Sequence, residues 1–482
     1  MHRRALRRRG GRLITAGAVT LCLLVALLGA RSAEAPLPSN TIIDLNRTEP
    51  AVAVDPLNPL RLLAASNSNY APNPLQRYPP AYFSSSDGGW HWQGSALPMP
   101  APFWTGADTS VAFDQRGVAY IGMVGEDPTA YCKQSARAAA ILVARSPSGG
   151  RVVGLPTVVD INPPGENDDK PSMTVWNAPA SADAVVYVVW TRWLDAGGSK
   201  IMFSRSLDGG RTYAPARALY SSAGSNMGAQ PAVGPHGELY VAWAHWTSAA
   251  TYTPMPLRIL VKRSLDQGRT FGDAVPLAAS WGLPLMLSPG LVRVFSMPSI
   301  GVDGRAGAVY VAWPRARVSR PVASAPLQAD IVLSRSRDRG ATWSAPVALN
   351  DSAVGDRFMP TLTTLAGGRV AVAFYDRRAD RRGFDVYLAS VQDVGSTLLR
   401  YPNRRLTRQM SSIDDVYYIA PGSTCLAPGR FIGDYITLAA DPAGGTLCAV
   451  WADTQRRARD QTDLRYSRVP IASAYVGTPW GQ

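Results

Sequence analysis

The chain has 482 residues, of which 46% are hydrophobic, and it contains 43 glycines and 39 prolines. A chain of this length and apolar content can bury a large core, which excludes an intrinsically disordered protein. The formal net charge is +14, but beyond the N-terminus the basic residues are dispersed, so we expect no nucleic-acid partner.

The first 35 residues have the pattern of a secretory signal peptide. An arginine-rich start is followed by the apolar stretch LITAGAVTLCLLVALLGA and by small residues at Ala33 and Ala35. We therefore expect cleavage after Ala35 and export of residues 36–482, as a single domain, to the periplasm or the cell exterior. Contact with a membrane is expected only if this N-terminal segment stays uncleaved.

Short runs rich in β-branched and aromatic residues recur along the rest of the chain. Examples are VYVVW at 186–190, LYVAW at 239–243, VYVAW at 309–313 and VAVAF at 370–374. Bounded by glycine, proline and aspartate, such runs are typical of strands that are buried on both faces. A similar run precedes each of them across a short turn, so each pair predicts a β-hairpin.

A third strand, such as ADIVLSRS at 329–336, and then a fourth follow each hairpin. One four-stranded antiparallel sheet is therefore expected per unit. The hairpins open near Pro50, Thr109, Pro171, Pro231, Pro298, Pro360 and Ile432. The last unit has only three strands of its own, and the early segment TIIDLN at 41–46 is expected to supply the fourth. This closure predicts an all-β fold, a β-propeller of seven blades, with six blades as the alternative.

A polar turn of the form Ser-x-Asp-x-Gly-x-Thr-aromatic recurs at intervals of roughly 60 residues. Complete copies contain Asp208, Asp266 and Asp338, and weaker copies contain Asp87, Ser148 and Asp393. The aspartate can accept hydrogen bonds from turn amides, and the aromatic residue can pack between sheets. A catalytic group is needed once, whereas a turn is needed in every sheet, so we predict a structural role for these aspartates.

These turns resemble the Asp boxes, or BNR repeats, of sialidase-like β-propellers. The resemblance covers residues 85–398 and implies that the boxes lie away from the functional site. It implies a glycoside hydrolase or a binding protein, because the family includes both. One expectation is thus a secreted, exo-acting glycoside hydrolase on anionic sugars. The alternative is a non-catalytic propeller that binds a glycan, a protein or the cell envelope.

Functional groups are expected on the mouth opposite the boxes, where loops enter first strands and leave second strands. The candidates on these loops are Arg47, Glu126, Asp127, Asp168, Asp169, Lys170, Arg192, Gln230, His245, Arg293, Arg315, Asp356, Arg357, Asp376, Arg377, Arg378, Arg430, Asp434, Tyr435 and Asp453.

The resemblance to sialidases assigns roles to some of these candidates. It implies three arginines on a substrate carboxylate, a tyrosine nucleophile activated by a glutamate, and an aspartic acid/base. Arg47, Arg357 and Arg430 would form the clamp, and Arg377 is a further binding candidate whose alternative is a solvated charged loop. Tyr435 would be the nucleophile and Asp169 the acid, with Glu126 available as the glutamate.

Cysteine and histidine are scarce in the exported part of the chain. Of Cys132, Cys425 and Cys448, we favour a Cys425–Cys448 disulfide because both fall in the last unit and the destination is oxidising. No zinc-type spacing is present, so we expect no cofactor, although the carboxylates of ENDDK at 166–170 leave calcium as an alternative. We expect a monomer.

Overall fold

The computed structural model describes residues 39–68, 78–127, 139–178, 181–319, 327–416, 418–419, 429–442, 444–455 and 462–480. The chain divides into residues 1–37 and residues 38–482, and the described residues all belong to the second unit. The predicted signal peptide, Cys132 and Cys425 lie outside them. In this described part, no helix is long and apolar enough to cross a membrane.

The described residues form antiparallel sheets in which four strands follow one another in order. The first strands are β2 (Arg47–Asp55), β6 (Thr105–Phe113), β10 (Glu166–Trp176), β14 (Ser225–Val233), β21 (Ser299–Val302), β25 (Arg357–Leu365) and β32 (Thr437–Ala440). The second strands are β3 (Asn58–Ser68), β7 (Ala119–Glu126), β11 (Val185–Leu194), β15 (Leu239–Trp246), β22 (Val309–Ala316), β26 (Arg369–Asp376) and β33 (Thr446–Asp453).

The outer strands complete these sheets. The third strands are β4 (Ala81–Ser85), β8 (Ala139–Ser146), β12 (Ser199–Ser206), β16 (Met255–Ser264), β23 (Ala329–Ser336), β27 (Gly383–Asp393) and β34 (Asp463–Pro470). The fourth strands are β5 (Gln93–Ala96), β9 (Thr157–Ile161), β13 (Arg217–Ser221), β17 (Val275–Pro276), β24 (Val347–Ala348), β28 (Leu398–Arg405) and β1 (Ser39–Asp44).

Shorter strands and helical turns are added to these sheets. Strands β18 (Ser280–Gly282) and β29 (Ser411–Ser412) pair with β16 and β27. A separate small sheet contains β19 (Met286–Leu287), β20 (Val292–Arg293), β31 (Gly429–Arg430) and β30 (Tyr418–Ile419). The helical elements are η2 (Ile413–Asp415) and α2 (Ile471–Ala474).

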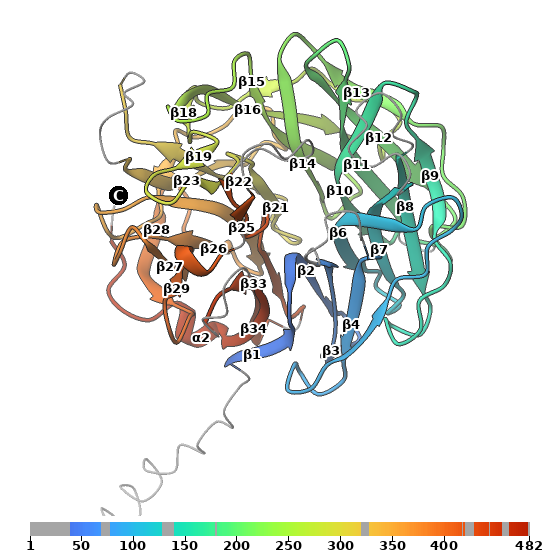
Figure 1. The fold of residues 1–482 in the computed structure, drawn as a ribbon, viewed down its shortest axis with the longest axis horizontal. Coiled ribbons are helices and arrows are strands. Elements are labelled where there is room, and N and C mark those ends of the chain that lie inside the picture. Colours follow the sequence, from blue (N-terminus) through green and yellow to red (C-terminus); the bar gives the residue numbers. More distant parts are fainter. Residues whose placement is uncertain are drawn as a thin grey trace, which may run out of the picture. The chain divides into compact units, whose positions relative to one another are not determined.

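The first strands surround a common centre (Figure 1). Each of them contacts the first strand of the next sheet, and β32 returns to contact β2. The predicted all-β fold of antiparallel four-stranded sheets is therefore confirmed. The count of seven blades stays a prediction, because the small sheet of β19, β20, β31 and β30 adds an eighth sheet within the described residues.

The N-terminal strand closes the ring, as predicted from the segment at 41–46. Strand β1 pairs with β34 in the order β1–β34–β33–β32, with Thr41 opposite Tyr466 and Asp44 opposite Leu464. Asn40 adds to this pairing, because its backbone N–H donates to Ser467 Oγ at 2.9 Å. The two ends of the folded unit thus share one sheet, which covers what would otherwise be an open edge.

The core lies between neighbouring sheets, and the second strands contribute most of it. Strands β11 and β15 are buried on both faces, as the sequence pattern predicts. Trp190, Trp243, Trp313 and Trp451 end the apolar runs of four second strands, and all four are fully buried. Burial of such aromatic side chains stabilises the contact between one sheet and the next.

The recurrent polar turns contain the predicted hydrogen bonds. Asp208 accepts from the amides of Arg211 and Thr212, each at 3.0 Å, and from the Thr212 hydroxyl at 2.6 Å. Asp87, Asp266 and Asp338 accept equivalent bonds in their own turns. Asp393 differs, because its carboxylate pairs with Arg335 and Arg337 and accepts from Tyr310 at 3.0 Å. These turns join third to fourth strands, at the end opposite the start of each first strand.

Replacing Asp208 with alanine is expected to lower the free energy of unfolding by about 1 to 3 kcal/mol, because turn amides lose their acceptor. Burial opposes ionisation, yet hydrogen bonds from Ser206 and Thr212 lower the pKa of Asp208 to about 2. A pKa that is lower in the folded state than in the unfolded state stabilises the fold at pH values above the unfolded-state pKa. This contribution is lost as the pH falls toward 2. Urea unfolding would measure the difference in free energy of unfolding between the wild type and Asp208→Ala. This difference should be smaller at low pH than at pH 7.

The matched control is Asp183→Ala, which removes a half-exposed carboxylate that pairs with Arg211 on the same face. A surface pair of this kind contributes about 0 to 1 kcal/mol. Equal losses of stability in the two variants would contradict the structural role of the turn.

The favoured Cys425–Cys448 disulfide is wrong. Cys448 is a free, fully buried thiol within β33. Its Sγ lies 3.3 Å from the hydroxyl of Tyr466 on the neighbouring strand β34. The side chain therefore packs inside the last sheet as a small apolar residue, whereas Cys425 lies outside the described residues.

Candidate functional site

The first strands share a local irregularity near their starting ends. In β2, β6, β10, β14 and β25 the pairing with the second strand shifts by a bulge at the same place. The bulges contain residues with positive φ, namely Glu49 (53°), Asp108 (56°), Lys170 (51°), Gly228 (67°) and Met359 (52°). A non-glycine residue in this region costs on the order of 1 to 3 kcal/mol, and bulges re-aim side chains near functional sites.

The charged bulge residues meet in what we call the charged cluster. Its members are Glu49, Asp108, Asp169, Lys170, Arg293 and Asp434. The Lys170 ammonium lies at its centre, 2.6 Å from Asp434 Oδ2, 3.5 Å from Asp108 and 3.8 Å from both Glu49 and Asp169. Only 8% of the Lys170 side chain is exposed, so these interactions act with little screening by solvent.

A closed chain of hydrogen bonds holds the cluster together. Glu49 Oε2 accepts from the side-chain amide of Asn67, whose Oδ1 accepts from the Asp108 amide at 2.8 Å. The Lys170 amide donates to Asp108 Oδ2 at 3.4 Å, and its ammonium donates to Asp434. The Asp434 amide then donates to Glu49 Oε1 at 3.2 Å, which completes the circle. Residues from three sheets and from the loop before β32 are fixed in one arrangement.

Arg293 and aromatic side chains complete the surroundings. Arg293 binds Asp434 through Nη2 at 2.8 Å and Nε at 3.2 Å. Its guanidinium lies 4.2 Å from the ring centre of Phe431 and 5.5 Å from that of Phe295. Such contacts are favourable cation–π interactions, and they orient Arg293 toward the cluster rather than toward solvent.

The pKa values of the acidic residues in the charged cluster are shifted in different directions. Burial raises the pKa of Asp169 to about 6, with Lys170 opposing and Asp108 adding to the rise. Burial, together with the charge of Asp108, also raises the pKa of Glu49 well above its usual value. Burial opposes ionisation of Asp434 as well, but Arg293 and Lys170 outweigh it and hold its pKa below the usual value. Asp169 is also held by Trp193, whose Nε1 donates to Oδ2 at 2.9 Å.

The predicted nucleophile, Tyr435, lies beside the charged cluster as a neutral phenol. Burial and the charges of Asp108 and Glu49 raise its pKa well above the usual value. Its hydroxyl donates weakly to the carbonyl of Thr109 at 3.5 Å, and its ring centre lies 5.9 Å from Lys170 Nζ. A tyrosine in this environment needs a base to become a nucleophile.

A cavity of about 430 Å³ adjoins the cluster and runs between the first strands. Lys170, Asp434 and Tyr435 line it, together with Phe295 and Thr109. Thr109 is only 2% exposed, and its hydroxyl has no hydrogen-bond partner among the described residues. The volume is in the usual range of ligand sites, about 300 to 1,000 Å³.

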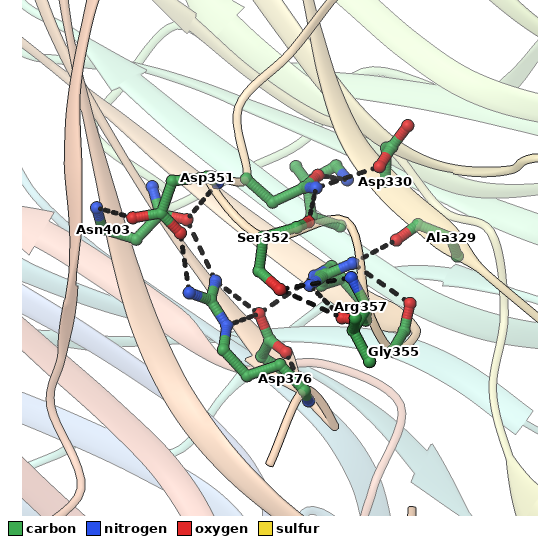
Figure 2. Close-up of polar contacts among 12 residues, drawn as sticks. Ala329, Asp330, Asp351, Ser352, Gly355, Arg357, Asp376 and Asn403 are labelled. Carbon is green, nitrogen blue, oxygen red and sulfur yellow. Dashed lines mark hydrogen bonds and ion pairs between the residues drawn. The ribbon is translucent and has the colours of Figure 1, made fainter. Parts of the chain in front are cut away.

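The predicted arginine clamp is not assembled. Arg357 is fully buried, and its guanidinium binds Asp376 at 3.0 Å and the carbonyls of Ala329 and Gly355 at 3.2 and 3.1 Å. Figure 2 shows this guanidinium enclosed by groups of its own chain. It has no exposed surface to offer to a ligand carboxylate.

The other predicted binding residues also have local partners. Arg47 pairs with Asp44 at 2.9 Å. Arg430 donates to the carbonyls of Asp414 and Val416 and pairs with the Asp414 carboxylate. Arg377 is 1% exposed and pairs with Asp356 at 3.4 Å. The arginine that reaches the charged cluster is instead Arg293.

The predicted glutamate partner of Tyr435 is Glu126. It ends β7, where its backbone carbonyl accepts from the amide of Trp104 at 3.2 Å. Glu49 is a glutamate whose charge raises the pKa of Tyr435.

The carboxylates of ENDDK are used by neighbouring side chains. Asp168 binds Arg192 at 2.7 Å and Trp190 at 3.0 Å, and Asp169 belongs to the charged cluster. In the ranges that the structure describes, no group of three or more His, Cys, Asp or Glu residues is placed to hold a metal ion.

Sequence reasoning found Asp169, Lys170, Arg293, Asp434 and Tyr435 but missed Glu49, Asp108 and Asn67. A signal for two of these was present. Glu49, Asp108 and Lys170 directly precede Pro50, Thr109 and Pro171, which open three successive units. Aligning the units on these openings would have placed the three charged residues at equivalent positions.

Comparisons with models of known protein families and with curated proteins give no match. Solved structures with a similar fold include an ulvan lyase described as a new family of polysaccharide lyase, at 9% identity and a TM-score of 0.54. This match covers 90% of this chain and 96% of the lyase. The likeness shows that the chain has this all-β fold.

Solved structures with lower TM-scores include glycoside hydrolases of propeller fold. An α-L-arabinanase from Penicillium chrysogenum has 11% identity and a TM-score of 0.49, over 91% of this chain and 99% of the enzyme. A leech intramolecular trans-sialidase has 12% identity and a TM-score of 0.46, over 94% of this chain and 72% of that one.

Proposed function

We propose that the protein is a carbohydrate-active propeller that hydrolyses a glycosidic bond at the charged cluster. Asp169 is the proton donor in this proposal. It gives its proton to the glycosidic oxygen as the carbon–oxygen bond breaks, and water adds to the sugar carbon and returns a proton to Asp169. Hydrolysis of this kind passes through a positively charged, oxocarbenium-like transition state.

The observation that carries the proposal is the clustering of carboxylates around Lys170 beside a cavity. Asp169 combines a pKa of about 6 with 21% exposure of its side chain, the largest among the carboxylates that pair with Lys170. A carboxylic acid with a raised pKa is suited to donate a proton near neutral pH. Ionised Asp434 beside it would stabilise positive charge on the sugar.

The proposal differs from the exo-sialidase expectation in two respects: water, not Tyr435, adds to the sugar carbon, and the substrate need not be anionic. The expectation of an anionic sugar depended on a clamp of Arg47, Arg357 and Arg430, and these residues have other partners. We retain the proposals that the sheets are seven blades of one domain at 36–482, that residues 1–35 are a signal peptide, and that the exported protein is a monomer.

Replacing Asp169 with asparagine is expected to reduce kcat about 100-fold or more, because general acid catalysis contributes about 10² to 10⁴. Release of methylumbelliferone from a panel of neutral, amino and acidic glycosides would measure activity. The wild-type rate should fall as the pH rises through about 6, where Asp169 loses its proton, and the variant should lack this limb. The loss should be greater for a disaccharide, whose leaving group needs a proton more.

The control is Asp183→Asn, which removes a carboxylate on the opposite face and should leave the rate unchanged. No turnover of any glycoside by the wild-type protein would refute hydrolysis and favour the non-catalytic binding protein. Equal activity in Asp169→Asn and wild type would refute the role of Asp169.

A further inference from the structure

The charged cluster contains more acidic than basic groups. Four carboxyl groups, those of Glu49, Asp108, Asp169 and Asp434, surround the two cations. All four contact Lys170 within 4 Å. The local field is therefore negative wherever these carboxyl groups are ionised.

Neither cation of the cluster is left for a ligand. The Lys170 ammonium is surrounded by carboxylates of the protein itself. The Arg293 guanidinium presents both Nε and Nη2 to Asp434, which is the fork geometry by which arginine would otherwise bind a ligand carboxylate. An acidic sugar would have to displace Asp434 and then lie among the remaining carboxylates.

The cavity wall has a second feature that is independent of charge. The buried hydroxyl of Thr109, without a hydrogen-bond partner in the described part of the chain, lies in the wall beside Tyr435. An unpaired buried hydroxyl is unfavourable by about 1 to 3 kcal/mol, so this part of the wall is polar. Phe295 and Met297 line the same cavity and suit the apolar face of a sugar ring.

We infer that the site takes a sugar that carries a protonated amine and rejects a sugar that carries a carboxylate. This inference rests on the proposed function for the identity of the site, and it adds the charge of the substrate. Asp169 is the most exposed of the four carboxyl groups, with 21% of its side chain accessible, so an ammonium group placed beside it would balance the excess of carboxylates.

Three sugars with the same ring test the inference. Glucosamine, glucose and glucuronate differ in one substituent each, and their binding to the mature protein would be measured by calorimetry at pH 7 and low salt. We expect glucosamine to bind about ten-fold more tightly than glucose and glucuronate more weakly than either. Higher salt should reduce the preference for glucosamine.

Two variants assign the preference to the cluster. Asp169→Asn should remove most of the preference for glucosamine over glucose, whereas Asp183→Asn, on the opposite face, should retain it. Loss of the preference in both variants would assign it to the charge of the whole protein and overturn the inference.

The outcomes separate the inference from the proposed function. Binding of glucuronate or glucose as tightly as glucosamine overturns the inference, even if the protein hydrolyses glycosides. Preferential binding of glucosamine without hydrolysis of any glycoside supports the inference and refutes the hydrolase. Absence of both binding and hydrolysis refutes both.

Discussion

Replacing Lys170 with methionine is expected to lower the free energy of unfolding by about 3 to 5 kcal/mol, because buried carboxylates lose their central cation. Methionine keeps a similar length without the charge. Asp434, at 2.6 Å, and Asp108, at 3.5 Å, would be affected most. Equilibrium unfolding in guanidinium chloride at pH 7 would measure the loss.

The pH dependence of this variant provides a second test of the same claim. Without Lys170 the pKa of Asp434 should rise in the folded state, because Lys170 helps to hold it below the usual value. A raised pKa in the folded state gives stability at low pH that is lost as the pH rises, so the deficit of the variant should shrink between pH 7 and pH 5.

The matched control is Lys200→Met. Lys200 is one-third exposed and lies 3.8 Å from Glu166, a distance and exposure at which a pair contributes about 0 to 1 kcal/mol. A loss below 1 kcal/mol in Lys170→Met, or an equal loss in both variants, would mean that the cluster is not an electrostatic unit.

Removal of β1 is expected to have the second large effect. A chain that begins at Asn46 lacks Ser39–Asp44, the strand that completes the last sheet. It loses the backbone ladder to β34, at about 1 kcal/mol for each hydrogen bond, and the bond from Asn40 to the carbonyl of Leu406 at 2.9 Å. We expect a lower Tm, and self-association through the exposed edge of β34.

Thermal unfolding and size-exclusion chromatography would measure both effects. The control is a chain that begins at Pro38 and retains β1. If the shorter chain had the same Tm as this control and remained a monomer, closure by β1 would contribute nothing to stability.

The sheet plan was predictable because its signals repeat. The apolar runs at 186–190, 239–243 and 309–313 end in a tryptophan that packs between sheets, and the similar run at 370–374 ends in a phenylalanine. Closure by the segment at 41–46 was predictable because the last unit lacked a strand. Because the same pattern occurs in several units, an error in assigning one strand does not change the predicted sheet.

The arginine clamp failed for a physical reason. Arg357 and Asp376 are opposite each other on β25 and β26, so a local ion pair forms within one hairpin. A single sequence shows that both residues lie near the mouth, but it does not show which partner each guanidinium binds.

The bulges explain why part of the charged cluster was missed. Glu49, Asp108 and Lys170 have positive φ, which a local pattern of strand residues does not predict. Packing between neighbouring first strands stabilises this conformation, and it turns their side chains into a shared site. Such strained positions are typical of functional sites.

The protonation of Asp169 tests the central claim, that the charged residues of the first strands form one coupled site with a poised acid. The titration of its side-chain carboxyl carbon would be followed by NMR in ¹³C-labelled protein, with assignment by Asp169→Asn. A midpoint near the expected pKa of about 6 would support the coupled site. A midpoint near 3.9, the value of an unperturbed aspartate, would contradict it.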